Sequence, residues 1–351
     1  MSTNEKQMAH PQPDPRSPAT PVDDRPRLTV LIATRNRPES LARTLRSVLT
    51  SAYPHFDIVV VENASDSTDT REMLATQFAM EPRIRYLNEP RRGLARAHNA
   101  GLRIIDAPLV AITDDDVVVD SSWLERIALA FTISPSVMCV TGMIVAAELV
   151  TPAQQWVESH LGFSKGARQR VFDLGPNRPV DPLFPYNAGS LGSGANMSFR
   201  TSFLNEIGGF DPALGAGSKA RGGDDLAAFY EVMVRDYSLV YEPAAIVHHF
   251  HHQTYEQLQK QMRGYGVGLG AFLTKVVAER PTSAIRLAAR TIPGLRHMYS
   301  MRKTAVDSPT PSFDGRFGRL QRDERMASLA GPWAYARSRW ATRNDRLDSV
   351  R

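Results

Sequence analysis

Three adjacent aspartates, Asp114-Asp115-Asp116, directly follow the apolar run at positions 109–112. Carboxylates this close repel one another by about 1 kcal/mol in water and ~4 kcal/mol at a protein surface. The stretch therefore predicts either a well-solvated turn or a site for a cation. Mg²⁺ and Mn²⁺ prefer oxygen ligands, and Mg²⁺ often bridges carboxylates to phosphates. If the strand continues, Asp114 and Asp116 point to the same side and could share the ion.

A second acidic pair, Asp224-Asp225, follows Gly222-Gly223 at the predicted start of a helix. One interpretation is a helix cap, in which each carboxylate gains about 0.3–1 kcal/mol from the helix dipole. A cap needs only one carboxylate, so the other is free to act as a general base. Such a base contributes about 10²–10⁴-fold to a reaction rate.

Four of the five residues at 248–252 are histidines, and Arg91-Arg92 precede the predicted helix start at Gly93. A surface loop is the default interpretation for each imidazole, but the cluster also predicts one metal or phosphate contact. Zinc is disfavoured because the cluster has no cysteine partner and no helix carries His at i and i+4. An arginine near Gly93 is suited to binding an anion through two hydrogen bonds.

Strand and helix signals alternate along the first third of the chain. The predicted strands cover 28–34, 57–63, 84–88 and 108–113, and helices begin near Pro38, Asp69 and Gly93. This alternation is typical of a parallel sheet covered by helices on both faces. Ligands bind at the carboxyl ends of such strands, so the polar groups at 34–37, 62–63 and 114–116 are expected to meet at one edge. No dinucleotide fingerprint and no phosphate-binding loop occurs.

The composition of the 351-residue chain, 42% hydrophobic and 23% charged, is that of an ordinary globular protein. Cys139 is its only cysteine, which excludes an intrachain disulfide framework and fits a reducing compartment. No secretory signal is visible, and the most apolar segment, 266–279, is short, rich in glycine and interrupted by Lys275. These features predict a cytoplasmic protein.

The net charge of +5 is concentrated at one end, because residues 281–351 hold 14 Lys/Arg and 6 Asp/Glu, a net of +8. The rest of the chain carries a net of −3, which argues against nucleic acid as a partner. Five apolar residues of this segment fall at helical spacing: Ile285, Ala288, Ile292, Leu295 and Tyr299. Three arginines lie off that apolar line: Arg286, Arg290 and Arg296. Such a helix could lie on an anionic membrane surface, and packing on the rest of the protein is the alternative.

Seven motifs in order resemble the family 2 glycosyltransferases with the GT-A fold: TVLIATRNRPESLARTLRSV, VVVENASDSTD, RRGLARAHNAGL, ITDDDVVVDSSWL, GSGANMSFR, IGGFDPALGAGSKARGGDDL and YEPAAIVHHFHH. The resemblance implies an α/β fold with a mostly parallel, Rossmann-like sheet flanked by helices and a smaller mixed region on the acceptor side. It also implies inverting transfer of a sugar from a nucleotide diphospho-sugar, UDP- or dTDP-linked, to an acceptor hydroxyl with Mg²⁺ or Mn²⁺. The acceptor would be a glycan or a lipid-linked molecule of cell-wall or surface glycan or glycolipid synthesis.

Carried over position by position, the resemblance assigns a role to twelve residues. Those for the nucleotide-sugar are Thr34, Arg35, Glu62, Arg92, Asn99, Asp114, Asp115 and Asn196. Asp116 would bind the metal, with Asp114 and His249 as further ligands, and Asp225 would be the base with Asp224 beside it. Two positions depart from the family pattern, since Glu62 stands where Asp is frequent and Asp224 stands where Glu is usual.

Three regions are expected: a proline-rich disordered tail at 1–26, the glycosyltransferase domain at 27–270, and a basic helical region at 271–351 that could bring the protein to the inner face of the membrane. Two other functions remain open. A sugar-1-phosphate nucleotidyltransferase would also use aspartates and a metal, but it should carry a Gly-rich loop with a basic residue after the first strand. A non-catalytic sugar-nucleotide or glycan-binding protein would tolerate Asp225→Asn.

Overall fold

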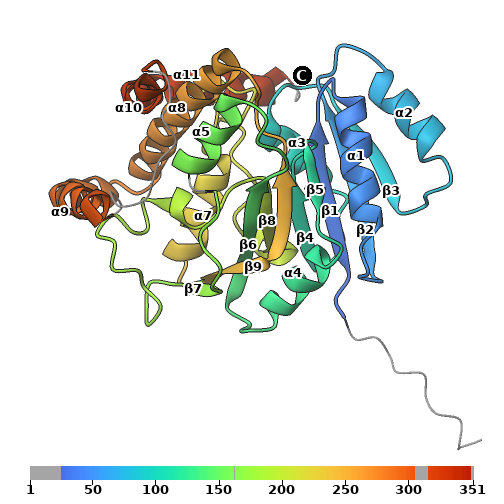
Figure 1. The fold of residues 1–351 in the computed structure, drawn as a ribbon, viewed down its shortest axis with the longest axis horizontal. Helices are drawn as coiled ribbons and strands as arrows, with labels where there is room; N and C mark the ends of the chain where they lie inside the picture. Colours follow the sequence, from blue (N-terminus) through green and yellow to red (C-terminus); the bar gives the residue numbers. More distant parts are fainter. Residues whose placement is uncertain (1–24, 162, 305–314, 349–351) are drawn as a thin grey trace, which may run out of the picture.

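The computed structural model describes residues 25–161, 163–304 and 315–348. In these ranges nine strands form one sheet with the order β3-β2-β1-β4-β8-β6-β9-β5, and β7 pairs with β9 (Figure 1). The strands are β1 (Leu28–Thr34), β2 (Phe56–Asn63), β3 (Ile84–Glu89), β4 (Leu109–Thr113), β5 (Val117–Val119), β6 (Val137–Ala146), β7 (Arg170–Phe172), β8 (Asn196–Arg200) and β9 (Ser238–His249). The helices are α1 (Pro38–Leu49), α2 (Asp69–Gln77), α3 (Leu94–Leu102), α4 (Trp123–Phe131), α5 (Pro152–His160), α6 (Thr201–Glu206), α7 (Asp224–Val234), α8 (Tyr255–Glu279), α9 (Thr282–Thr304), α10 (Leu320–Ser328) and α11 (Gly331–Asp348), with 3₁₀ turns η1 (Ala188–Ser190) and η2 (Phe317–Arg319).

The sheet has a parallel half and a mixed half. β1 lies parallel to β2 and β4, and β2 lies parallel to β3. β8 runs antiparallel to both β4 and β6, and β5 runs antiparallel to β9. The predicted fold class is therefore confirmed, including the mixed region, and the strand predicted at 28–34 coincides with β1.

β9 continues through Pro243 to His249. Pro243 cannot donate to a sheet ladder. The chain instead bulges, and the pairing with β6 shifts between Gly142↔Glu242 and Met143↔Ile246. The bulge carries the histidines on to the edge where the acidic stretch lies.

Two apolar layers cover the two faces of the sheet, as the near-continuous apolar strands require. On one face α1, α2 and α4 pack on alternate strand residues such as Val30 and Ile32. On the other face α3, α6, α7 and α8 pack on the intervening residues such as Leu31. Strand side chains alternate in direction, so one apolar strand supplies both layers.

The glycine-rich stretch at 264–270 lies in α8 and is explained by close helix packing. A Cβ at Gly266 would lie 2.0 Å from the carbonyl oxygen of Glu324, and one at Gly270 would lie 2.1 Å from that of Ser328. These glycines let the backbone of α10 lie directly on α8. Glycine here permits helix contact, and among the described residues no helix has the length and apolar composition to cross a membrane.

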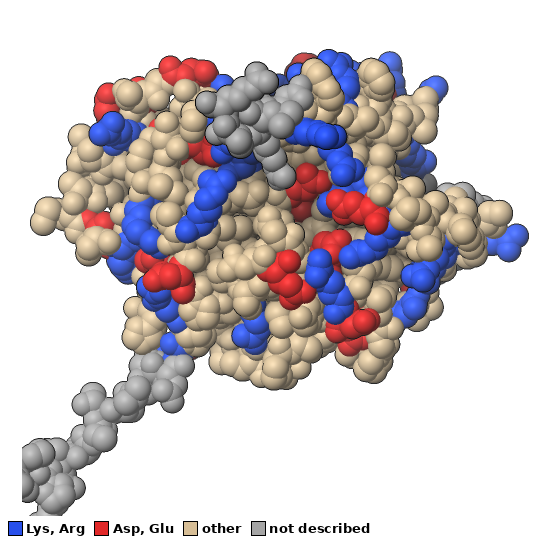
Figure 2. All heavy atoms as spheres, turned by 180° about the vertical axis from the view of Figure 1, so that it is seen from behind, with Lys and Arg blue, Asp and Glu red and all other residues tan. Residues whose placement is uncertain are grey.

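The predicted tail at 1–26 lies outside the described residues except for Arg25 and Pro26. The predicted boundary at 270–271 falls within α8, and α9 and α10 lie at the opposite end of the molecule from α2 (Figure 1). The division into a domain at 27–270 and a region at 271–351 stays a prediction. On the face seen in Figure 2, basic and acidic side chains are interspersed.

Candidate active site

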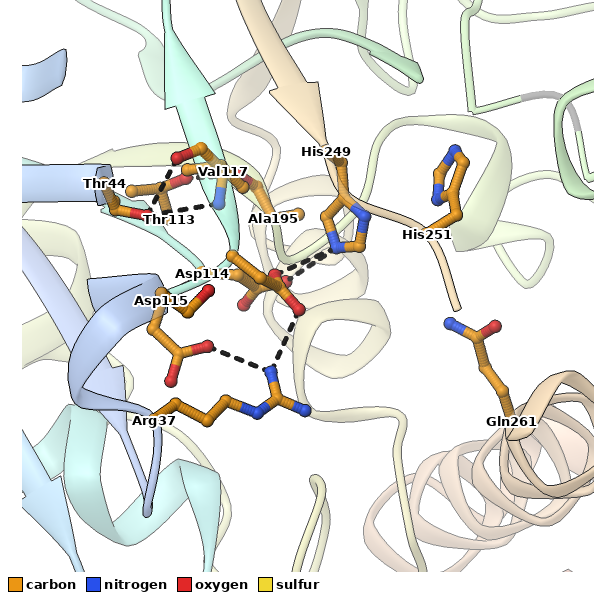
Figure 3. A network of polar contacts seen from close by, with 12 residues as sticks. Arg37, Thr44, Thr113, Asp114, Asp115, Val117, Ala195, His249, His251 and Gln261 are labelled. Carbon is orange, nitrogen blue, oxygen red and sulfur yellow. Dashed lines mark hydrogen bonds and ion pairs between the residues drawn. The ribbon is translucent and has the colours of Figure 1, made fainter. Parts of the chain in front are cut away.

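The acidic stretch forms a bend between two strands. β4 ends at Thr113 and β5 resumes at Val117, whose sheet partner is His249. This pairing places Nε2 of His249 3.2 Å from Oδ1 of Asp116 and 3.8 Å from Oδ2 of Asp114 (Figure 3). Burial disfavours the charged imidazole, but hydrogen bonds and charges of the two aspartates raise the pKa of His249 to about 10.

Asp114, Asp116 and His249 form a group that fits a divalent cation. One ligand atom from each residue lies within 4.8 Å of the others. Two carboxylates and an imidazole are donors that Mg²⁺ or Mn²⁺ accepts, and the raised pKa of His249 reports the surplus of negative charge. The sequence predicted these three residues as metal ligands, and the structure brings them together.

Arg37 contacts the aspartates of the acidic stretch from the side opposite His249 (Figure 3). Its Nη1 donates to Oδ1 of Asp115 at 3.1 Å and to Oδ2 of Asp116 at 2.9 Å. Oγ1 of Thr34 donates to the other oxygen of Asp115 at 2.6 Å. Burial raises the pKa of Asp115 to about 6 although Arg37 opposes the shift. Both oxygens of Asp115 therefore accept hydrogen bonds from protein groups.

Glu62 lies beside this cluster at the end of the next strand, in register with Thr34. Its side chain is buried and accepts a hydrogen bond from the hydroxyl of Tyr86, whose pKa rises to about 12, chiefly through burial. The other carboxylate oxygen, Oε1, is buried and has no donor among the described residues. Arg35 lies nearby, where Nε donates to the carbonyl oxygen of Ala64 at 2.8 Å.

Three residues predicted to bind the nucleotide-sugar do not line either of the cavities at the acidic stretch. The side-chain amide of Asn99 is engaged with the backbone of Phe210, to which Nδ2 donates at 2.7 Å and from which Oδ1 accepts at 2.8 Å. Asn196 is buried, donates to the carbonyl oxygens of β6 and β9, and accepts from Nε1 of Trp123 at 2.9 Å. Arg92 is exposed. Asn99 and Asn196 thus hold the scaffold of the site.

Two adjoining cavities open at the acidic stretch. The smaller, about 160 Å³, is lined by Arg37, Asp114, Asp116 and His249. The larger, about 470 Å³, is lined by Asp114, Asp224 and Asp225. Both share the side chains of Asp114, Phe163, Ser193, Ala195 and Tyr265. A ligand in both cavities would span from the cation-binding group to the second acidic pair.

The second acidic pair begins α7, after Gly223 with φ 88°. Oδ2 of Asp225 accepts from the backbone N–H of Gly194 at 3.1 Å, and Oδ1 accepts from that of Leu226 at 2.8 Å. Burial raises the pKa of Asp225, and burial together with the charge of Asp225 raises the pKa of Asp224 to about 7. Asp225 is thus a fixed carboxylate with raised basicity at the wall of the larger cavity.

Residues 29–207, just over half of the chain, match the family model "Glycosyl transferase family 2". The chain belongs to this family. It is 27% identical over 246 residues to the pre-mycofactocin glycosyltransferase of Mycobacterium tuberculosis, covering 70% of this chain and 46% of that protein. It is 23% identical to the glucosyl-dolichyl phosphate glucuronosyltransferase of Haloferax volcanii, covering 64% of this chain and 69% of that one. The chain spans about half the length of the first of these curated relatives.

The fold is similar to that of a solved GT-A enzyme, the mannosyltransferase PcManGT from Pyrobaculum calidifontis in complex with GDP-Man and Mn²⁺. The TM-score is 0.57 at 19% identity, and 88% of each chain is covered. This likeness confirms the GT-A fold.

Several cavity residues of this family 2 glycosyltransferase were assigned no role from the sequence. Arg37 belongs to the polar stretch at 34–37, which was expected to meet 114–116 and does so, but no role was assigned to it. His98, Lys165 and Tyr265 also line the larger cavity. His98 lies within the motif RRGLARAHNAGL but was assigned no role, and the other two lie in none of the seven motifs. They come from α3, from the segment before β7 and from α8, and only the folded chain brings them together.

Proposed function

We propose that this protein is an inverting glycosyltransferase that moves a sugar from a nucleotide diphospho-sugar, UDP- or dTDP-linked, to an acceptor hydroxyl. The observation that carries the proposal is the pair of adjoining cavities, with a cation-binding group at one end and the fixed carboxylate of Asp225 at the other. A cavity of about 470 Å³ is within the ordinary range for small-molecule ligands.

Asp114, Asp116 and His249 would hold the cation. Bound there, Mg²⁺ or Mn²⁺ would neutralise the diphosphate and stabilise it as a leaving group. Arg37 supplies a further positive charge beside Asp116. The buried, unpartnered Oε1 of Glu62 offers an acceptor for the ribose or the base.

Asp225 would accept the proton of the acceptor hydroxyl. The hydroxyl oxygen then bonds to the anomeric carbon as the bond from that carbon to the diphosphate oxygen breaks, and its electron pair leaves with the nucleoside diphosphate. Attack from the side opposite the leaving group inverts the anomeric carbon. Two backbone N–H groups fix the carboxylate of Asp225, and a raised pKa makes it a stronger base.

We further propose a glycan or lipid-linked acceptor in surface glycan or glycolipid synthesis, and a cytoplasmic protein held at the inner face of the membrane by α9. The inner side of α9 packs on the body, since Arg290 donates to the carbonyl oxygen of Phe184 and Leu287 packs on the core. Of the predicted apolar line, Ile285 is 76% exposed and Ile292 is 63% exposed, while the side chains of Leu295 and Tyr299 lie outside the described ones. The Haloferax volcanii relative is named a glucosyl-dolichyl phosphate glucuronosyltransferase, and this name includes a dolichyl phosphate.

A thermal-shift screen of UDP-, dTDP- and GDP-sugars with and without Mn²⁺ tests the proposal. A ligand at 100 times its dissociation constant adds about 2.7 kcal/mol of stability. Asp116→Asn should lose the metal-dependent shift, whereas Asp225→Asn should keep the shift and lose sugar transfer. Asp236→Asn, on an exposed residue just after α7, is the matched control. Transfer by Asp225→Asn at the wild-type rate, or no metal-dependent shift with any nucleotide, would contradict the proposal.

A further inference from the structure

The larger cavity contains a histidine that the proposed mechanism does not use. His98 lies on α3 and is 2% exposed, and it lines the cavity together with Asp114 and Asp225. Its Nδ1 is buried without a hydrogen-bond partner among the described residues. A buried polar group without a partner costs about 1–3 kcal/mol, so its position in a ligand cavity calls for an explanation.

The ring of His98 is held in a defined position. The ring of Phe210 packs on it with a centroid distance of 5.1 Å and an interplanar angle of 54°. The adjacent residue Asn99 fixes the backbone of Phe210 through two hydrogen bonds. Because α3 carries both His98 and Asn99, the same helix places the imidazole and the aromatic wall beside it. The imidazole is therefore preorganised for a ligand.

The chemistry of the ring fits a hydroxyl group. Burial lowers the pKa of His98 to about 4, so the ring is neutral near pH 7. Nδ1 of a neutral imidazole is a donor in one tautomer and an acceptor in the other, and a hydroxyl group can accept from the first or donate to the second. The cavity lies between the cation-binding group, where the diphosphate is expected, and Asp225, where the acceptor is expected. The transferred sugar would occupy the space between them.

We propose that His98 hydrogen-bonds a hydroxyl of the transferred sugar and thereby selects among donor sugars. The inference rests on the proposed function. His98→Leu removes the hydrogen bond at similar volume, and His98→Gln keeps a donor and an acceptor. His160→Leu is the matched control, because His160 lies outside both cavities and stacks on Trp156.

Binding is measured by calorimetry with Mn²⁺ and without acceptor, using UDP-glucose, UDP-galactose, UDP-N-acetylglucosamine, dTDP-glucose and GDP-mannose against the bare diphosphates. His98→Leu should weaken binding of the best sugar nucleotide about 10–100-fold, which is the cost of leaving a buried hydroxyl without a partner. Binding of the bare nucleotide should stay within about twofold of the wild type. His98→Gln should recover part of the loss, and His160→Leu should match the wild type. The ratio of the dissociation constants for UDP-glucose and UDP-galactose should be closer to one in His98→Leu than in the wild type.

Nitrogen NMR of histidine-labelled wild-type protein gives a second readout. The ring resonances of His98 should shift with the sugar nucleotide and stay in place with the bare diphosphate. The inference would be overturned if His98→Leu lost as much affinity for the bare nucleotide as for the sugar nucleotide. It would also be overturned if the ring resonances of His98 did not respond to the sugar. A loss confined to the KM of the acceptor would also overturn it. Absence of any metal-dependent nucleotide binding by the wild type would instead refute the proposed function.

Discussion

Gly268→Ala tests how α8 positions the proposed base. A Cβ at Gly268 would lie 2.8 Å from the carbonyl carbon of Gly222 and 3.1 Å from the backbone nitrogen of Gly223. Both contacts are with backbone just before Asp225, so a side-chain rotation cannot relieve them. Alanine favours a helix by about 1 kcal/mol over glycine, but overpacking costs about 1–3 kcal/mol. Because backbone must shift, we expect a net destabilisation of about 1–2 kcal/mol.

Gly264→Ala is the matched control on the same helix. The nearest atom to its Cβ would be the carbonyl oxygen of Arg221 at 3.9 Å, an ordinary contact. Only the helix preference then acts, so this variant should gain about 1 kcal/mol. The two substitutions have the same chemistry and opposite expected signs.

Urea unfolding and thermal melting measure the two free energies, and 1 kcal/mol corresponds to about 1–2 °C at this chain length. Displacing a catalytic group by about 1 Å can cost ~100-fold in rate, so Gly268→Ala should lower kcat about 10–100-fold. Its affinity for nucleotide and Mn²⁺ should remain unchanged, since Gly268 is not among the residues that line the cavity of Asp116 and His249. If Gly268→Ala were as stable and active as Gly264→Ala, the close approach would not position the base.

Three further predictions concern charges and the surface of α9. The rate of transfer should fall as pH drops through the raised pKa of Asp225, at a higher pH than for an ordinary aspartate, because the base must be ionised; a rate independent of pH down to about 4 would contradict this. Burial raises the folded-state pKa of Asp224 to about 7, above its unfolded value of 3.8, so its contribution to stability is present below pH 3.8 and is lost as pH rises to about 7. The free energy of unfolding of Asp224→Asn relative to the wild type should therefore rise between pH 3.8 and about 7 and stay constant above that. Chemical unfolding at several pH values measures this difference. A difference that does not change with pH would count against the prediction. Replacing Ile285 and Ile292 by Ser should weaken sedimentation with anionic liposomes at low salt without changing the melting temperature, and equal binding by this variant would count against the α9 proposal.

Two of the three residues of the cation-binding group could be predicted from local sequence patterns. Asp114 and Asp116 follow an apolar strand, and a strand end is readable from the sequence. His249 was assigned only through the resemblance, because its approach depends on the pairing of β5 with β9 across more than a hundred residues. Asn99 and Asn196 show the opposite case, since their positions match the family motifs while their side chains are engaged with backbone and Trp123.

The sequence by itself determined the alternation of strands and helices, the parallel half of the sheet and the acidic residues at strand ends. Those features follow from side-chain periodicity, which acts over neighbouring residues. Only the tertiary structure decided that Arg37 binds the acidic bend, that His98 lines the larger cavity, and that the glycines of α8 serve helix contact. These depend on distances between segments far apart along the chain, and such distances are set by packing of the whole fold.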